Sequence, residues 1–143
     1  MKIKQISVFV ENTVGRVAAI TRSIADAGVD IRALSMADTS DFGILRLIVN
    51  KPEAAIEKLQ KAGLTVILTD VIAVGIEDKP GAFADVADIL GKANVNIEYM
   101  YAFVSRKSNN AFVILRVEDW QRGMDALETA GVYLLDGSEV YDM

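Results

Sequence analysis

Two short segments with similar spacing carry the residues that could bind a charged small molecule. Glu11 to Val17 reads ENTVGRV, and Glu77 to Phe83 reads EDKPGAF. Each segment follows an apolar run and precedes a 3.6-residue apolar pattern, which predicts a strand that turns tightly into a helix. A glycine in that turn, Gly15 or Gly81, lets a ligand approach the backbone closely. The first N–H groups of the helix and its dipole would then attract a carboxylate or a phosphate.

A glycine at such a position can also serve only the backbone. For one isolated glycine, a short turn between a strand and a helix is the simpler interpretation. The same spacing in both halves of the chain favours binding instead. We therefore expect two related sites that face an anion.

Composition excludes several classes of function. The chain has 143 residues, 52% of them hydrophobic, which is enough to bury the core of one large domain or of two small ones. It contains no cysteine and no histidine, so disulfides, the commonest metal ligands and the usual nucleophile-and-base pairs are not expected. No metal and no cofactor are predicted.

Charge and hydropathy limit the partners and the location. The net charge is −5, and the longest basic cluster is Arg106-Lys107, so nucleic acid is not an expected partner. The first residues lead into a strand-like alternation, and no apolar run approaches the length that spans a bilayer. We expect a cytoplasmic protein with no membrane partner.

The two glycine segments belong to an internal repeat. An ungapped offset of 66 residues places Gly15 on Gly81 and matches four further pairs: Ala18 with Ala84, Ala27 with Ala93, Val29 with Val95, and Ile31 with Ile97. Later the offset becomes 68, and it matches Leu47 with Leu115, Leu59 with Leu127, and Gly63 with Gly131. The two extra residues fall in the polar segment 105–110, which predicts a longer hairpin connection.

Each repeat predicts the order strand, helix, strand, strand, helix, strand. The strands expected in the first repeat are Ile6–Val10, Ile31–Met36, Ile44–Val49 and Thr65–Thr69, and those of the second are Ile72–Ile76, Ile97–Ala102, Phe112–Val117 and Ser138–Tyr141. One helix follows each glycine turn and ends at Gly28 or Asn94, where a left-handed cap is expected. A second helix begins at Pro52 in one repeat and after Asp119, a predicted N-cap, in the other.

This order predicts an α+β fold. Two βαβ units that share one antiparallel sheet make a ferredoxin-like βαββαβ sandwich, with both helices on one face. We expect two such sandwiches in tandem, over residues 1–70 and 71–143, with no flexible linker between them.

The third strand of each repeat is apolar on both faces. Leu45, Leu47 and Val49 are expected to face the helices, whereas Ile48, like Ile114 in the second repeat, points the other way. A sheet with helices on one side usually has a polar outer face. Either the other repeat or a second copy of the chain must cover it, and we favour a homodimer.

The tandem pattern resembles a pair of ACT domains, which are small-molecule-binding regulatory modules of many enzymes of amino-acid metabolism. The family motifs are an acidic residue or Asn, two residues, Gly and an apolar residue, followed about fifteen positions later by a run similar to Gly-Val-Asn-Ile. The first copy has Asn12–Gly15 with Gly28–Ile31, and the second has Asp78–Gly81 with Asn94–Ile97. The second copy matches the family motifs more closely than the first does.

The resemblance implies a function and a set of site residues. In such pairs two copies lie side by side, and a free amino acid binds near the glycine loop, at the seam between the repeats. The implied ligand-binding residues are Asn12, Thr13, Val14, Gly15, Arg16, Asp30, Ile31, Asp78, Lys79, Pro80, Gly81, Ala82, Phe83, Asn96 and Ile97. No catalytic residue is implied. The expected protein is a sensor that could act on a regulated enzyme or another protein.

Two other functions use the same topology. A small phosphate-handling enzyme would hold phosphate in the loop beside Arg16, although Ala82 occupies that position in the second repeat. An RNA-binding sheet would stack bases on Tyr99, Tyr101 and Phe112, which the acidic charge disfavours.

The two repeats also differ in chemistry. The loop and strand positions are Asn12 and Asp30 in one repeat and Asp78 and Asn96 in the other, so each repeat has one amide and one acid. If a site combines the loop of one repeat with the strand of the other, one site holds two amides and the second two acids. If each site comes from one repeat, both sites are alike and equal affinities are expected.

Overall fold

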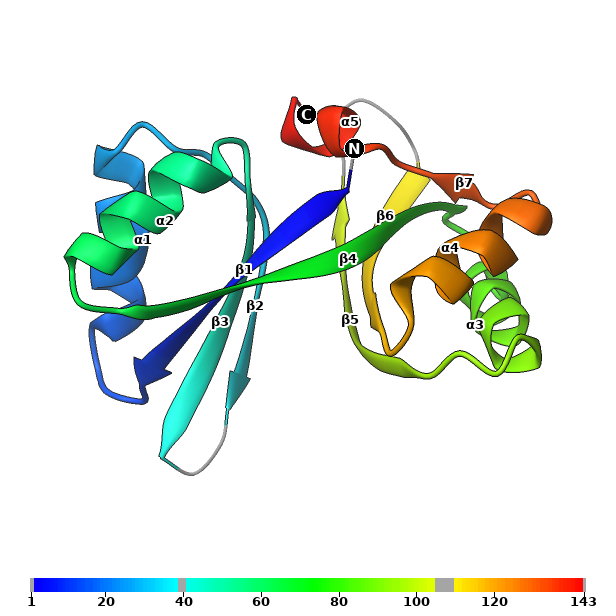
Figure 1. Ribbon diagram of the computed structural model, residues 1–143, viewed down its shortest axis with the longest axis horizontal. Helices are drawn as coiled ribbons and strands as arrows, with labels where there is room; N and C mark the ends of the chain where they lie inside the picture. Colours follow the sequence, from blue (N-terminus) through cyan, green and yellow to red (C-terminus); the bar gives the residue numbers. More distant parts are fainter. Residues whose placement is uncertain (1, 39–40, 105–109, 143) are drawn as a thin grey trace. The chain divides into compact units, whose positions relative to one another are not determined.

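The computed structural model describes residues 2–38, 41–104 and 110–142 (Figure 1). The chain divides into two compact units. The first unit is Lys4–Thr69, and the second is Asp70–Tyr141 together with Lys2 and Ile3. The longer hairpin connection predicted at 105–110 lies almost entirely outside the described residues.

The first unit has the predicted order of elements. These are β1 (Ile3–Glu11), α1 (Arg16–Asp26), β2 (Ile31–Asp38), β3 (Phe42–Val49), α2 (Pro52–Lys61) and the first part of β4 (Thr65–Glu77). The strands lie in the order β2-β3-β1-β4. β3 is antiparallel to both β1 and β2. This is the strand order of a ferredoxin-like sandwich.

The second unit repeats this order from the second part of β4 onward. Its elements are α3 (Ala82–Lys92), β5 (Ile97–Val104), β6 (Asn110–Val117), α4 (Trp120–Thr129), β7 (Tyr133–Leu134) and α5 (Gly137–Tyr141). β6 lies between β5 and β4, and β7 pairs with the other edge of β4. Within the described ranges, no helix is long and apolar enough to cross a membrane.

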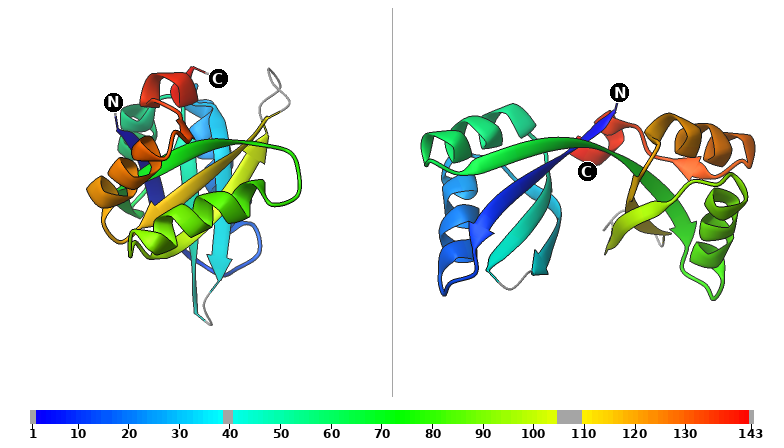
Figure 2. Two further views of the ribbon diagram at one scale, coloured as in Figure 1. Left: turned by 90° about the vertical axis from the view of Figure 1, so that its right-hand side faces the viewer. Right: turned by 60° about the horizontal axis from the view of Figure 1, so that its bottom comes forward.

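In each unit both helices cover one face of the strands (Figure 2). The core between these layers contains the side chains that the sequence alternation assigned to it. In the first unit it includes Ile6, Val8, Val10, Ile20, Ile24, Leu45, Leu47, Val49 and Leu59, and in the second Ile72, Val74, Val86, Leu90, Val113, Leu115, Val117 and Leu127. The predicted α+β fold of two tandem sandwiches is confirmed.

The opposite face of each third strand is also buried. Ile48 and Ile114 are both 0% exposed in the single chain, and neither belongs to the core beneath the helices. The prediction that something covers these side chains is therefore confirmed. The homodimer stays a prediction.

The four main helices end in the same way. Gly28, Gly63 and Gly131 have φ values of 75°, 81° and 77°, and Asn94 is the non-glycine residue with positive φ, 57°, in the described part of the chain. After α3, the N–H of Asn94 bonds to the carbonyl of Gly91, and the N–H of Val95 to that of Leu90. This is a Schellman motif, and the predicted cap role of Asn94 is confirmed.

The strand predicted at Ser138–Tyr141 is wrong. The last strand is Tyr133–Leu134, and a short helix follows. The carboxylate of Asp136 accepts the N–H of Ser138 at 3.1 Å, and the carboxylate of Glu139 accepts the N–H of Asp136 at 2.9 Å. This reciprocal capping box starts a helix where a strand was expected.

Candidate ligand-binding site

Both glycine segments form the same backbone turn. The N–H of Arg16 bonds to the carbonyl of Thr13, and the N–H of Ala82 to that of Lys79, each at 3.3 Å. The third residue of each turn is the glycine, with φ and ψ of 87° and −7° at Gly15 and of 86° and −10° at Gly81. These are the angles of a type II turn, which requires a positive φ at that position and favours a proline such as Pro80 before it.

The turns leave two helix N-termini open. Gly15 and Gly81 are the N-caps of α1 and α3, and neither helix has a side-chain cap. At α4, by contrast, the carboxylate of Asp119 accepts the N–H of Arg122, as predicted. A Cβ built on either glycine would meet nothing within 4 Å. The turns use the N–H groups of Arg16 and Ala82, and the N–H groups that follow them in α1 and α3 can receive an outside acceptor.

The first turn has donors around it. The amide nitrogen of Asn12 donates a hydrogen bond of 3.0 Å to the carboxylate of Asp38, at the end of β2. The Nε of Arg16 is buried and has no hydrogen-bond partner among the described residues. A buried donor without an acceptor is uncommon in a folded protein. The first turn therefore combines open backbone donors with a guanidinium whose hydrogen bonding is incomplete.

The second turn carries a different set of charges. Asp78 replaces the amide, and Ala82 replaces the arginine. The ammonium of Lys79 is 3.1 Å from the carboxylate of Glu77, so this cation is already paired. Phe83 is partly buried and packs on the core of its unit. The backbone of this turn suits an anion as well as that of the first turn does, but its side chains suit it less.

The residues predicted from the second motif lie elsewhere in each unit. Asp30 precedes β2, where its carboxylate is 2.8 Å from Arg32 and its N–H bonds to the side-chain oxygen of Asn50. Asn96 precedes β5, and its carbonyl accepts the N–H of Glu118. Ile31 and Ile97 are partly buried against the two cores.

Loop and strand-start residues of one unit are at opposite ends of its sheet. Glu11 pairs with Phe42 at one end of β3, whereas Ile31 pairs with Val49 at the other. Seven residues of strand separate these pairs, which is about 23 Å. The same holds in the second unit, where Glu77 pairs with Asn110 and Ile97 with Val117.

That separation bears on whether a site takes its loop and its strand start from the same repeat or from different repeats. A free amino acid is much shorter than the sheet is long, so a loop and a strand start of the same unit cannot both contact one ligand molecule. The ligand site expected where the two repeats meet remains a prediction.

Asp38 was not among the predicted residues. Its place beside Asn12 depends on the register of three strands, because Glu11 and Asp38 each lie opposite the same end of β3. Nothing in the local sequence shows that register.

Comparison with known proteins identifies relatives of the whole chain. The family described as ACT domain pair matches residues 1–139. Protein BT0572 from Bacteroides thetaiotaomicron is 36% identical, with a TM-score of 0.93 over 100% of this chain and 98% of that chain. A search among curated proteins found no match.

More distant solved structures share the fold. The regulatory subunit of aspartate kinase from Thermus thermophilus, in its ligand-free form, is 19% identical, with a TM-score of 0.65 over 91% of this chain and 93% of that chain. The corresponding subunit from Thermus flavus is also 19% identical, with a TM-score of 0.63 over 92% and 94%. The match of the family to nearly the entire length settles the classification: this chain belongs to the family of ACT domain pairs.

Proposed function

We propose that the protein is a regulatory module without catalytic activity, and that it binds the carboxylate of a free amino acid at its glycine turns. The observation that carries this proposal is the repeated type II turn, which leaves the N-termini of α1 and α3 uncapped behind Gly15 and Gly81. Backbone N–H groups and the helix dipole at such an end stabilise a bound anion.

Family membership supports the regulatory part of the proposal. Two of the structural neighbours are named as regulatory subunits of aspartate kinase. A role as the regulatory partner of an enzyme or of another protein fits a chain that consists of an ACT domain pair over almost its full length.

The first turn is the better carboxylate site of the two. Asn12 contributes no charge there, and the buried Nε of Arg16 has a free donor position among the described residues. At the second turn Asp78 adds a negative charge, which repels a carboxylate at short range. We expect the first turn to bind the ligand more tightly.

The ammonium and the side chain of the ligand need further contacts. Within one unit these cannot come from Asp30 or Asn96, because the strand starts lie at the far end of the sheet. The amide oxygen of Asn12 can accept from the ammonium, and we expect contacts to the ligand side chain to come from another ACT unit. β2 and β5 are the edge strands of their sheets, and they expose Leu34, Met36 and Met100. An exposed edge with apolar side chains favours pairing with another strand, so we propose a homodimer.

A thermal-shift screen of the twenty amino acids tests the function. A ligand at a hundred times its dissociation constant adds about 2.7 kcal/mol to the free energy of unfolding. We expect at least one amino acid to raise the melting temperature in a concentration-dependent way. If none of the twenty raises it at millimolar concentration, the proposal fails.

An assay with acyl phosphates separates this function from the phosphate-handling alternative. We expect no hydrolysis above the buffer rate, because Arg16 is the only charged side chain within the first turn and its helix start. Hydrolysis that the wild-type chain catalyses and the Arg16→Ala variant does not would overturn the non-catalytic assignment.

A further inference from the structure

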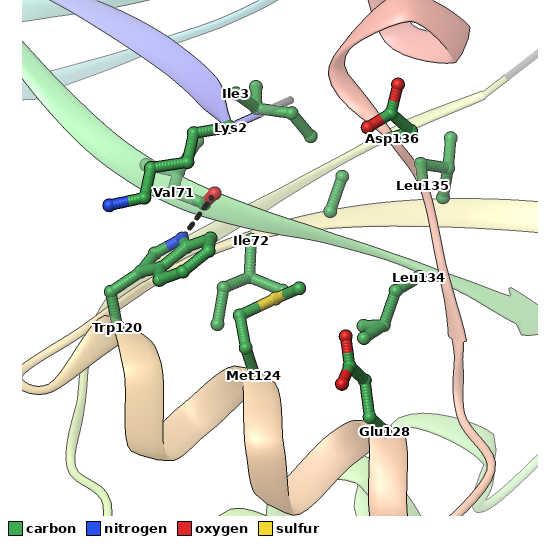
Figure 3. Close-up of a pocket in the computed structure, with 11 residues that line it drawn as sticks. Lys2, Ile3, Val71, Ile72, Trp120, Met124, Glu128, Leu134, Leu135 and Asp136 are labelled. Carbon is green, nitrogen blue, oxygen red and sulfur yellow. Dashed lines mark hydrogen bonds between the residues drawn. The ribbon is translucent and has the colours of Figure 1, made fainter.

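The second unit contains a cavity of about 310 Å³ on the side of α4 that faces β4 (Figure 3). Its apolar wall comes from Ile72, Met124 and Leu134, and the indole of Trp120 closes one end. Three charged side chains, Lys2, Glu128 and Asp136, also line it. The volume is near the lower end of the range for small-molecule pockets, about 300 to 1,000 Å³.

The cavity exists because β7 is short. β7 pairs with β4 at Val74 and Gly75, and the N–H of Leu135 still bonds to the carbonyl of Ala73 at 2.9 Å. After Leu135 the chain turns into α5, so β7 does not continue along β4. The indole N–H of Trp120 donates instead to the carbonyl of Val71, at 3.2 Å. The side chain thus replaces the missing strand and leaves a hollow beside it.

Two of the three charged side chains already have partners within the unit. The ammonium of Lys2 lies 4.5 Å from the centre of the Trp120 ring and 3.5 Å from the carboxylate of Asp70. The carboxylate of Asp136 accepts both the N–H and the hydroxyl of Ser138. The side chain of Glu128, by contrast, has no hydrogen bond or ion pair within the described part of the chain.

The first repeat has no counterpart of the Trp120 indole or of the Glu128 carboxylate. With the offset of 68 residues, Trp120, Met124 and Glu128 correspond to Pro52, Ile56 and Gln60. Neither the indole nor the carboxylate is present there. The polar lining of the cavity is therefore particular to the second repeat, and it includes no residue of either glycine turn.

We propose that this cavity binds a small molecule with an apolar body and a protonated amine. The apolar body lies on Ile72, Met124 and Leu134, and the ammonium pairs with the carboxylate of Glu128. A carboxylate on the ligand gains little here, because Lys2 is already held by Asp70 and by the indole. Aliphatic amines and apolar amino acids share the required chemistry.

The fluorescence of Trp120 provides a direct test, because it is the single tryptophan of the chain. The full-length protein is titrated with 3-methylbutylamine, with leucine, and with the neutral 3-methylbutan-1-ol and the anionic 3-methylbutanoate. We expect a saturable change with the amine, and affinities at least about tenfold lower for the alcohol and the acid. A response to leucine equal to that of the amine would extend the ligand class to amino acids, and a response to the amine alone would restrict it to amines.

Two variants test whether the ammonium of the ligand pairs with Glu128. Glu128 is exposed on α4, so Glu128→Gln should fold normally and weaken amine binding about tenfold. Asp125→Asn removes a carboxylate from the same helix outside this cavity, and should leave the affinity unchanged. The proposal is overturned if the amine changes neither the fluorescence nor the melting temperature, or if Glu128→Gln binds the amine as tightly as the wild type. Amino-acid binding at the glycine turns would be unaffected by Glu128→Gln, so the two proposals fail separately.

Discussion

The side-chain amide of Asn12 donates a 3.0 Å hydrogen bond to the carboxylate of Asp38. This contact joins the first glycine turn to the last residue of β2, at the end of the sheet opposite to Asp30. It leaves the amide oxygen of Asn12 available to a ligand ammonium. The second turn has no amide in this position, because Asp78 replaces Asn12.

Exchanging these two side chains should exchange the properties of the turns. Asn12→Asp places a second carboxylate beside Asp38, and should lower the affinity of the first turn for a carboxylate ligand about tenfold. Asp78→Asn removes the corresponding charge, and should raise the affinity of the second turn. Calorimetric titration of both variants measures each change. Unaltered affinities in both would show that the turns are not the binding determinants.

The left-handed conformation of Gly81 should make substitutions at this position costly in free energy of unfolding. At a φ of 86°, a β-branched side chain is strained, so Gly81→Val should lower the free energy of unfolding by about 2 kcal/mol in urea. Gly81→Asn should cost less, because Asn tolerates this conformation. Gly91, inside α3 and without a positive φ, is the control. Gly91→Ala should stabilise the helix by about 0.5 to 1 kcal/mol; equal costs for Val and Asn at Gly81 would refute the strain argument.

The same substitution should have different effects on stability at the buried Ile114 and at the exposed Ile67. Ile114→Glu introduces a carboxylate where the side chain is 0% exposed, and should destabilise the fold by about 4 kcal/mol or more, because the charge has no partner there. Ile67→Glu makes the same chemical change at a side chain that is 47% exposed, and should stay within about 0.5 kcal/mol. Urea unfolding followed by circular dichroism compares them. Similar losses at both positions would contradict the assigned burial.

The hydroxyl of Tyr133 predicts a pH dependence. Partial burial, the charge of Glu139 and a 3.2 Å hydrogen bond to that carboxylate raise the pKa of Tyr133 above its ordinary value. The folded chain therefore keeps this proton at a pH where the unfolded chain loses it. The resulting stability is present below about pH 10 and is lost as the pH rises through the folded pKa.

The variant Tyr133→Phe isolates this contribution. It keeps the ring that covers Gly75, so packing is preserved. The free energy of unfolding of the variant should fall less steeply above pH 10 than that of the wild type. Parallel slopes in the two proteins would show that Tyr133 does not contribute.

Much of the fold could be predicted because its signals are local or repeated. Alternation placed Ile6 and Val8 in the core, and the matched offsets showed that Asn94 takes the role of Gly28 as a helix cap. The end of the chain differs from the prediction, although a local signal for the helix is present. The segment Asp136 to Glu139 has the spacing of a capping box, which favours a helix over the strand predicted at Ser138–Tyr141.

The remaining features depend on long-range register. The contact between Asn12 and Asp38 requires three strands to be in place, and the cavity beside Trp120 requires β7 to stop after two residues. No local pattern encodes the register that brings Asn12 to Asp38, whereas the end of β7 follows from the capping box at Asp136 to Glu139. The motif placed the glycine turns correctly at the starts of α1 and α3, but it could not show that Asp30 lies at the far end of the same sheet.

Calorimetric titration with an amino acid and with its carboxamide tests the central claim most directly. The amino acid is the one that raises the melting temperature most in the screen. Its carboxamide has nearly the same shape but lacks the negative charge and one acceptor oxygen. Binding at the uncapped ends of α1 and α3 predicts saturable heat for the acid and an affinity at least about tenfold lower for the amide. Equal affinities for the two, or no heat with the acid, would contradict the account.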